Sequence, residues 1–240
     1  MTVGMIQNRI IGVTGITGSG TSTVSAILAE LGGYVISADK LAREVMEPGQ
    51  PAYEEIVRVF GPDVIAGPNV IAGPNVIAGS TRNPELNRKA LGAIVFGNPQ
   101  KLKQLESIIH PAVIARVHEL LGCVGDAALG VPQTPRCASF GTLKAASPTV
   151  HPHFFVIDAP LLIESGLHTL CHSVWLVTAR DDIRLARIIH RDSLTKEAAT
   201  QRLNSRAGDD ILRPHANVII ENNTDLAALR AQVERNLQLQ

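Results

Sequence analysis

The stretch Gly15-Ile16-Thr17-Gly18-Ser19-Gly20-Thr21-Ser22 matches the phosphate-loop pattern G-x-x-x-x-G-K-[ST] at every defined position except one, where Thr21 replaces lysine. Glycines allow backbone N–H groups to close around phosphate oxygens, and the positive end of a following helix points to the same place. The terminal hydroxyl, here that of Ser22, ligates Mg²⁺ in such loops. The lysine that reaches the β- and γ-phosphates is absent, so Thr21 is the feature that argues against nucleotide turnover.

The residues around this loop have the order strand, loop, helix. Residues 9–14 form a short β-branched run, and residues 23–31 have apolar side chains at helical spacing. A glycine-rich turn without any ligand is the alternative interpretation, but the position after the first strand and the Ser22-Thr23 pair favour a phosphate site. The residues expected to bind the nucleotide are Gly15, Thr17, Gly18, Ser19, Gly20, Thr21, Ser22 and Thr23.

Short apolar runs alternate with helical stretches along the rest of the chain. The runs expected to be strands are residues 34–36, 154–158, 174–177 and 218–220. The expected helices are residues 41–47, 51–60, 84–95, 99–121, 181–191, 196–206 and 226–237, and the fourth of them is expected to bend or break at His110-Pro111. Apolar strands that alternate with helices predict an α/β fold with a parallel sheet covered on both faces.

Two segments have no core periodicity. Residues 65–79 repeat Ile-Ala-Gly-Pro-Asn-Val two and a half times, fewer than the roughly three repeats that a solenoid needs, and predict a turn-rich surface loop. Residues 122–153 are rich in Gly, Ala, Ser and Pro and have almost no charge. We interpret them as a mobile, low-complexity insertion.

Composition excludes several classes of partner. The 22 Lys and Arg residues cancel the 22 Asp and Glu residues, and aromatic residues are 3% of the chain, so neither a nucleic acid nor an anionic membrane is expected to bind. The apolar runs are shorter than the roughly 18 residues that a membrane span needs. Three cysteines without paired spacing and an amino terminus without a targeting pattern indicate a cytoplasmic protein.

Motifs beyond the phosphate loop narrow the class of nucleotide-binding protein. A GTPase guanine motif is missing, because Thr195-Lys196 is followed by Glu197-Ala198, and a small-molecule kinase fits better. A series of motifs runs along the chain in this order: the phosphate loop, Val35-Ile36-Ser37-Ala38-Asp39, Ala42-Arg43-Glu44-Val45, Pro48 to Ala52, Leu86 to Leu91, Val95-Phe96, Leu105 to Pro111, Ile157 to Glu164, Arg187, Arg191-Asp192, and Ala216 to Asn223. In these motifs and their order the chain resembles the dephospho-CoA kinase family. The resemblance covers nearly the whole chain except residues 65–80 and 122–153.

The resemblance implies a P-loop kinase fold with a parallel five-stranded sheet. It implies a nucleotide-binding core at residues 1–47 and 154–240, a lid at about 185–210, and a helical substrate-binding domain at 48–121, with 122–153 inserted between them. The implied reaction moves the γ-phosphoryl group of ATP, with Mg²⁺, to the ribose 3′-hydroxyl of dephospho-CoA. The sequence leaves the oligomeric state open.

The resemblance also implies the catalytic residues. Asp39 matches the family's catalytic carboxylate, and a position just past a strand end suits a group that accepts the hydroxyl proton. A helix N-cap is the equally available alternative for Asp39. Arg187 and Arg191 lie one helical turn apart and are expected to face the phosphates from a closed lid, although the same pair on a solvated helix has no function.

Substrate and metal contacts follow from the same resemblance. Arg43, Arg88 and His110 match positions of the substrate domain, where Arg88 and His110 are equally compatible with structural roles. Mg²⁺ is expected at Ser22 and, through water, at Asp158, for which a capped turn before Pro160 is the alternative.

Two more departures from the family are Ser37, where Asp is usual, and Arg206, where Gln is usual. Neither is the catalytic carboxylate, so altered local charge is expected. Because of Thr21, a pseudokinase that binds nucleotide without turnover is the rival hypothesis. A different small-molecule P-loop kinase is the third.

Overall fold

The computed structural model describes residues 9–66, 85–128, 153–204 and 209–239. The chain divides into two compact units, residues 1–37 with 121–240 and residues 38–120. We call the first the core unit and the second the helical unit, and each is described by itself.

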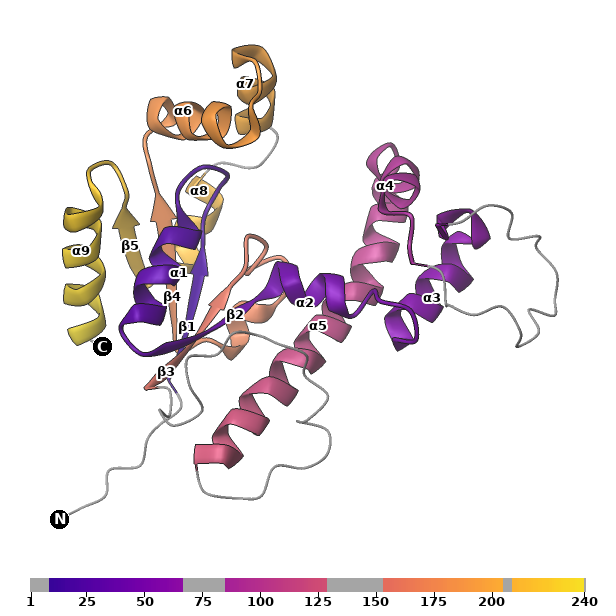
Figure 1. Ribbon diagram of the computed structural model, residues 1–240, viewed down its shortest axis with the longest axis horizontal. Helices are drawn as coiled ribbons and strands as arrows, with labels where there is room; N and C mark the ends of the chain where they lie inside the picture. Colours follow the sequence, from indigo (N-terminus) through magenta and orange to yellow (C-terminus); the bar gives the residue numbers. More distant parts are fainter. Residues whose placement is uncertain (1–8, 67–84, 129–152, 205–208, 240) are drawn as a thin grey trace. The chain divides into compact units, whose positions relative to one another are not determined.

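The core unit is built on a sheet of five parallel strands in the order β2-β3-β1-β4-β5. The strands are β1 (Ile10–Thr14), β2 (Gly33–Ser37), β3 (Phe154–Asp158), β4 (Ser173–Thr178) and β5 (Val218–Glu221). In register, Asp158 lies beside both Val13 and Ser37, so β1, β2 and β3 end at the same edge of the sheet (Figure 1). The expected five-stranded parallel α/β sheet is confirmed.

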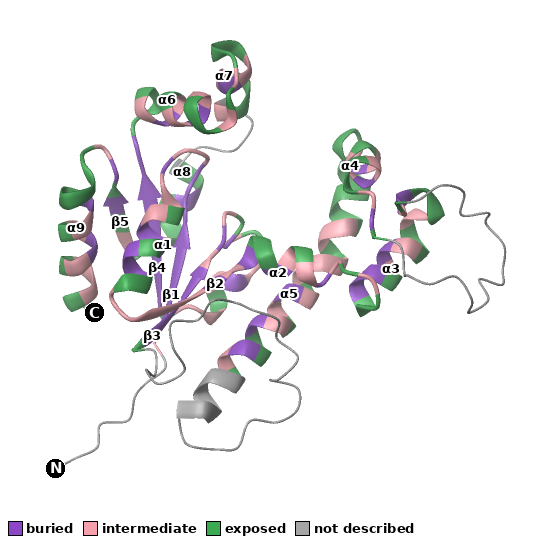
Figure 2. Ribbon diagram, viewed as in Figure 1, coloured by how far each residue is buried: buried purple, intermediate pink, exposed green. Residues whose placement is uncertain are grey.

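The central strands are buried because consecutive residues along them are mostly apolar and do not alternate with polar ones. All residues of β1 and β4 are buried, and Trp175 of β4 is fully buried (Figure 2). Helices α1 (Thr21–Glu30) and α9 (Leu226–Gln238) pack on them through Val24, Leu28 and Leu229. Each apolar side chain of this size contributes about 1.5–3 kcal/mol when fully buried, so this packing holds the first helix, and with it the preceding loop, against the sheet.

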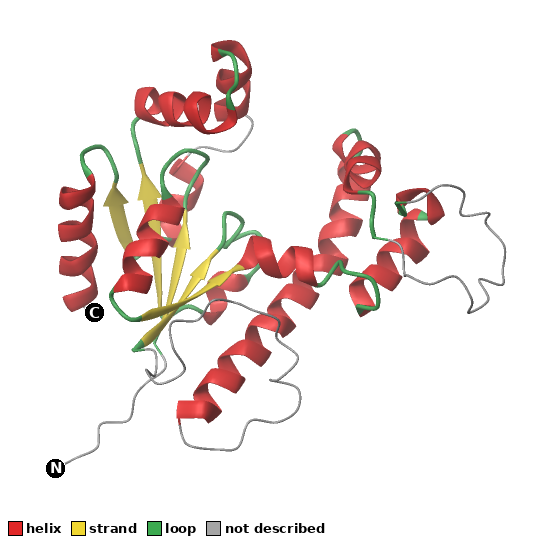
Figure 3. Cartoon of the chain, viewed as in Figure 1, coloured by secondary structure: helices red, strands yellow, loops and turns green. Residues whose placement is uncertain are grey.

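The other helices of the core unit follow β3 and β4. They are the 3-10 helix η2 (Leu167–Leu170), α6 (Asp181–Asp192), α7 (Lys196–Asn204), α8 (Asp209–Leu212) and the 3-10 helix η3 (Arg213–His215). Helix α6 ends at Ser193, whose φ of 51° is left-handed, and α6 and α7 pack together beyond the carboxyl ends of the strands (Figures 1 and 3).

The helical unit contains α2 (Ala38–Glu44), α3 (Pro51–Phe60), the 3-10 helix η1 (Pro62–Val64), α4 (Arg88–Phe96) and the first part of α5 (Pro99–Ala128). Its apolar cluster comprises Tyr53, Ile56, Val64, Leu86, Leu91 and Val95. The Arg116 guanidinium of α5 donates from Nε and Nη2 to the Glu44 carboxylate at 2.8 and 2.6 Å. This ion pair ties the end of α2 to α5.

Several element boundaries differ from the sequence expectation. Helix α4 begins at Arg88 and not at Pro84, because Leu86 pairs with Ile65 in an antiparallel bridge and Asn87 caps the helix through the Ala90 amide. Of the expected bend or break at His110-Pro111, the break is wrong, because α5 continues through Pro111 and extends past Leu121 to Ala128. The bend stays a prediction. The absent proline N–H removes one backbone hydrogen bond, and the bonds on either side preserve the helix.

Other differences concern helix starts. Helix α1 begins at Thr21 instead of 23, since Gly20 adopts a left-handed cap and its carbonyl accepts from the Thr23 and Val24 amides. Helix α2 begins at Ala38, not 41, and α8 and η3 were not expected. Residues 67–79 of the repeat, residues 129–152 of the expected insertion, and Arg206 of the expected helix 196–206 lie outside the described residues.

Candidate functional site

The glycine loop connects β1 to α1 at the carboxyl edge of the sheet. Gly18 and Gly20 have φ values of 84° and 98°, which L side chains rarely adopt, and the Ser19 amide donates to the Ile16 carbonyl at 3.1 Å. A Cβ at Gly15 would lie 2.5 Å from the Val177 carbonyl oxygen. The glycines are therefore required by backbone conformation and by close approach of β4, and the loop turns tightly into the helix.

Side chains from distant parts of the chain bind the outward carbonyls of this loop. Arg184 Nε donates to the Thr17 oxygen at 3.0 Å, and Asn222 Nδ2 donates to the Ser19 oxygen at 2.8 Å. Arg187 Nη1 donates to the Gly18 and Ser19 oxygens, each at 3.3 Å. Because the C=O and N–H of a trans peptide point in opposite directions, the bonds to the Thr17 and Ser19 carbonyls turn the Gly18 and Gly20 amides toward the side where an anion can bind. The Ser19 amide, which follows the Gly18 carbonyl, donates instead to the Ile16 carbonyl.

Arg187 and Asn222 also bind each other. Arg187 Nη2 donates to the Asn222 backbone and side-chain oxygens, both at 3.1 Å, and the Asn222 amide donates to the Thr178 carbonyl at 2.8 Å. Asn222 is 5% exposed. The structure thus places Arg187 against the phosphate loop. Asn222, the residue after β5, also accepts hydrogen bonds from the Arg187 guanidinium.

Arg191 is placed differently. Its exposed guanidinium donates to both carboxylate oxygens of Asp192 at 2.8 and 2.9 Å, and this hydrogen-bonded cation lowers the pKa of Asp192. Arg202 forms a further ion pair with Asp192 at 3.0 Å. The two expected lid arginines therefore have separate partners, and the structure brings only Arg187 to the loop.

The hydroxyl groups of the loop differ in exposure. Ser19 is 1% exposed, and its Oγ has no hydrogen-bond partner among the described residues, which suits a donor reserved for a phosphate oxygen. Ser22 is exposed, while Thr17, Thr21 and Thr23 are half-buried. The Thr21 methyl group lies close to the backbone at Gly15. Thr21 therefore fills space beside the loop and supplies no positive charge.

Asp158 ends β3 at the same edge of the sheet as the loop. It is half-buried, and its backbone lies beside Val13 in the ladder. Among the described residues, no three His, Cys, Asp or Glu side chains gather as a metal-binding cluster.

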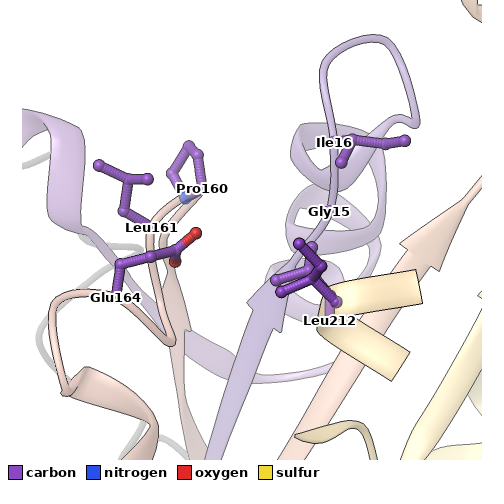
Figure 4. A pocket seen from close by; sticks show the side chains of 7 residues that line it. Gly15, Ile16, Pro160, Leu161, Glu164 and Leu212 are labelled. Atoms are coloured by element: carbon purple, nitrogen blue, oxygen red, sulfur yellow. The ribbon is translucent and has the colours of Figure 1, made fainter. Parts of the chain in front are cut away.

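A pocket opens between the loop, the turn after β3, and α8 (Figure 4). Its walls are mostly apolar, and Glu164 is the charged member of the lining. The lining residues are Gly15, Ile16, Pro160, Leu161, Glu164, Ile211 and Leu212. Because Gly15 and Ile16 belong both to the pocket lining and to the phosphate loop, the pocket adjoins the loop.

The remaining expected site residues belong to the helical unit. Asp39 is exposed in the first turn of α2, and Arg43 is exposed in its last turn. Arg88 is the exposed first residue of α4, and His110 is half-buried within α5. Asp39 lies inside α2 and is not the residue before it, so the structure gives it a place in the first turn instead of the alternative N-cap position.

Arg184 and Asn222 were not singled out from the sequence. Arg184 had a visible signal, because it is an arginine three residues before Arg187 on the same helix, so the two share a face. Asn222 lies 203 residues from the carbonyl that it binds, and no local pattern reveals such a contact.

Gly20→Ala tests the loop geometry. An alanine Cβ would overlap Asn222 Nδ2 and would require a φ near 98°, so we expect kcat/KM for ATP to fall about 10²-fold, the cost of misplacing groups at a reacting centre. Gly166→Ala is the matched control, because Gly166 has a φ of 79° with nothing within 4 Å of the added carbon. It should lower the melting temperature and leave kcat/KM for ATP unchanged. Equal kcat/KM values in the two variants would contradict the expectation.

The parallel sheet and the glycine loop at the end of its first strand define the class of protein, a P-loop nucleotide-binding α/β protein. A family model described as dephospho-CoA kinase matches residues 9–138 and 139–228, so the chain belongs to the dephospho-CoA kinase family. A kinase of this family uses ATP as co-substrate.

Individual relatives agree with this membership. A dephospho-CoA kinase of Symbiobacterium thermophilum is 37% identical, covering 94% of this chain and 79% of the relative, and one of Moorella thermoacetica is 34% identical, covering 93% and 88%. Among solved structures, TT1252 from Thermus thermophilus has a TM-score of 0.68 at 27% identity over 96% of both chains. The dephospho-CoA kinase from Campylobacter jejuni has a TM-score of 0.57 at 28% identity over 95% of both. Within the described residues, no helix is long and apolar enough to cross a membrane.

Proposed function

We propose that this protein transfers the γ-phosphoryl group of ATP to the ribose 3′-hydroxyl of dephospho-CoA. The single observation that supports the reaction most strongly is the glycine loop at the carboxyl end of β1, in a chain of the dephospho-CoA kinase family. The carbonyls of Thr17 and Ser19 accept hydrogen bonds from Arg184 and Asn222, which leaves the Gly18 and Gly20 amides for an anion. In this proposal the ATP phosphates lie on those amides and on the Ser19 hydroxyl, which has no hydrogen-bond partner within the part of the chain that the structure describes.

Mg²⁺ is the proposed metal. Ser22 offers an exposed hydroxyl in the first turn of α1, and Asp158 offers a carboxylate at the end of β3. Both are oxygen donors of the kind that Mg²⁺ prefers, and few protein ligands fit an ion that keeps its waters and binds phosphates. When bound, the metal supplies charge neutralisation for the transferring group. The residues present therefore fit this group.

Asp39 is the proposed proton acceptor. It is the second residue after β2, whose carboxyl end lies at the same edge of the sheet as those of β3 and β1, and ligands of open α/β sheets bind at this edge. A carboxylate there is suited to take the proton from the attacking 3′-hydroxyl oxygen as that oxygen bonds to phosphorus and the ADP oxygen leaves. Its exposure and its place in the first turn of α2 leave the carboxylate accessible.

Arg187 is the proposed source of the charge that lysine supplies in other phosphate loops. Its guanidinium lies against the carbonyls of Gly18 and Ser19, three and two residues before Thr21. Positive groups outside the loop stabilise the transferring phosphoryl group in related chemistry. Arg187 therefore acts as a fixed charge behind the loop.

The remaining residues are assigned to substrate binding and closure. We propose that Arg43, Arg88 and His110 of the helical unit bind the anionic acceptor, and that Arg191 acts from a lid at about residues 185–210. The domain roles given to residues 48–121 and 122–153 are proposals as well. The absence of a nucleic-acid partner and the cytoplasmic location stay predictions.

A pseudokinase is the second candidate function. Thr21 favours it, since neither its hydroxyl nor its methyl group replaces a positive donor. The two candidates share ATP binding and differ in turnover.

One assay separates the candidates. The protein is incubated with ATP, Mg²⁺ and either dephospho-CoA or a nucleoside, and both ADP and the phosphorylated acceptor are measured. We expect ADP and coenzyme A in equal amounts with dephospho-CoA only. Product from a nucleoside alone would indicate another small-molecule kinase, and ATP binding without any product would indicate the pseudokinase.

A further inference from the structure

We propose that Arg184 is a positioning residue of the phosphate loop, on which ATP binding depends. This inference rests on the proposed function, because it concerns the same loop. Arg184 lies in the first turns of α6. It is 167 residues from Thr17 in the sequence and is not one of the residues that define the phosphate-loop motif.

The burial of Arg184 is the first observation. It is 5% exposed, whereas arginine is almost never fully buried without partners. Its Nη1 donates to Asp181 Oδ1 at 2.8 Å, but the Asp181 side chain is 77% exposed and largely in water. A solvated carboxylate alone does not explain why the guanidinium is held inside the protein.

The contact with the loop is the second observation. Arg184 Nε donates to the Thr17 oxygen at 3.0 Å. The backbone oxygen of Arg184 would lie 3.0 Å from a Cβ at Gly18, so helix α6 packs directly against the same peptide. The Thr17 carbonyl is therefore fixed on the α6 side, and the Gly18 amide of that peptide points the opposite way.

Arg184 and Arg187 together bind three consecutive carbonyls. Arg184 binds that of Thr17, and Arg187 binds those of Gly18 and Ser19. Each cation behind the loop also adds positive potential at a site that is poorly exposed to water, where charges interact more strongly than in bulk solvent. Arg184 thus orients an amide and raises the local potential, both of which favour a bound triphosphate.

The experiment measures the Kd for a non-hydrolysable ATP analogue with Mg²⁺ by calorimetry, on the full chain. Arg184→Met keeps the apolar stem and removes both the hydrogen bonds and the charge. We expect a roughly tenfold higher Kd, since a hydrogen bond to a charged group contributes about that much to an equilibrium. Arg184→Lys keeps the charge and should give an intermediate Kd, which also serves if the methionine variant does not fold.

Two control variants exclude a general effect of α6. Arg180→Met removes an exposed arginine at the start of the same helix that binds Asp182 and has no side-chain bond to the loop, so its Kd should equal that of the native protein. Asp181→Asn removes the carboxylate partner of Arg184 and leaves the Thr17 contact, so its Kd should not rise.

The outcomes distinguish this role from the proposed function. Unchanged Kd values in both Arg184 variants, with a lower melting temperature, would make Arg184 a structural residue only and would leave phosphoryl transfer intact. A rise in Kd for Asp181→Asn as large as that for Arg184→Met would assign the effect to the ion pair and overturn the role of the Thr17 contact. Failure of the native protein to bind the analogue would overturn both proposals.

Discussion

We expect Asp39→Asn to lower kcat for coenzyme A formation by about 10²- to 10⁴-fold, the usual contribution of a general base. The amide occupies the same volume in the first turn of α2 but does not accept the proton of the 3′-hydroxyl. The Kd for ATP stays at the native value, because the loop residues that bind phosphate are unchanged. Product formation under saturating substrates and calorimetric ATP binding measure the two quantities.

Asp63→Asn is the control for this variant. Asp63 is also exposed in the helical unit, in the 3-10 helix η1, and it has no proposed role in the reaction. Its kcat should equal that of the native protein. If Asp39→Asn also retains the native kcat and loses only about 0.3–1 kcal/mol of stability, Asp39 acts solely as an acidic residue in the first turn of a helix.

We expect Thr21→Lys to raise kcat/KM for ATP by up to about 10²- to 10³-fold, the loss seen when one donor to a developing charge is removed. The new ammonium is carried by the first residue of α1. Arg187→Ala then lowers kcat/KM more in the native background than in the Thr21→Lys background, because lysine already supplies the charge. We measure kcat/KM for the native chain, the two single variants and the double variant. These four values give the coupling between positions 21 and 187.

The four hydrogen bonds that Arg187 forms with the loop and Asn222 require a second comparison. Arg187→Lys retains the positive charge and loses the planar fork that reaches several acceptors at once. If charge is what matters, Arg187→Lys keeps more activity than Arg187→Ala. Equal losses from Arg187→Ala in both backgrounds would contradict compensation by this arginine, and absence of phosphoryl transfer in every background would support the pseudokinase.

Much of the fold could be predicted from contiguous sequence. The loop from Gly15 to Ser22 is a local motif, and the five apolar runs identified the five strands, because each strand is short and almost continuously apolar. The family follows from the order of pieces along the chain, and the matching family model covers most of it. The predicted helix ends were less accurate where a cap or a bridge decides them, as at Gly20 and Asn87. The break expected at Pro111 was wrong, because α5 continues through that residue.

The sequence by itself determined that a phosphate loop without lysine follows the first strand of a parallel α/β sheet. Only the tertiary structure decided what surrounds that loop: Arg184 and Arg187 of α6, and Asn222 after β5, on its outward carbonyls. It also separated Arg191, which binds Asp192, from Arg187. The physical reason is that motifs and periodicity report interactions between neighbours in the chain, whereas the partners of these carbonyls come from segments that meet the loop only after β1, β4 and β5 have paired.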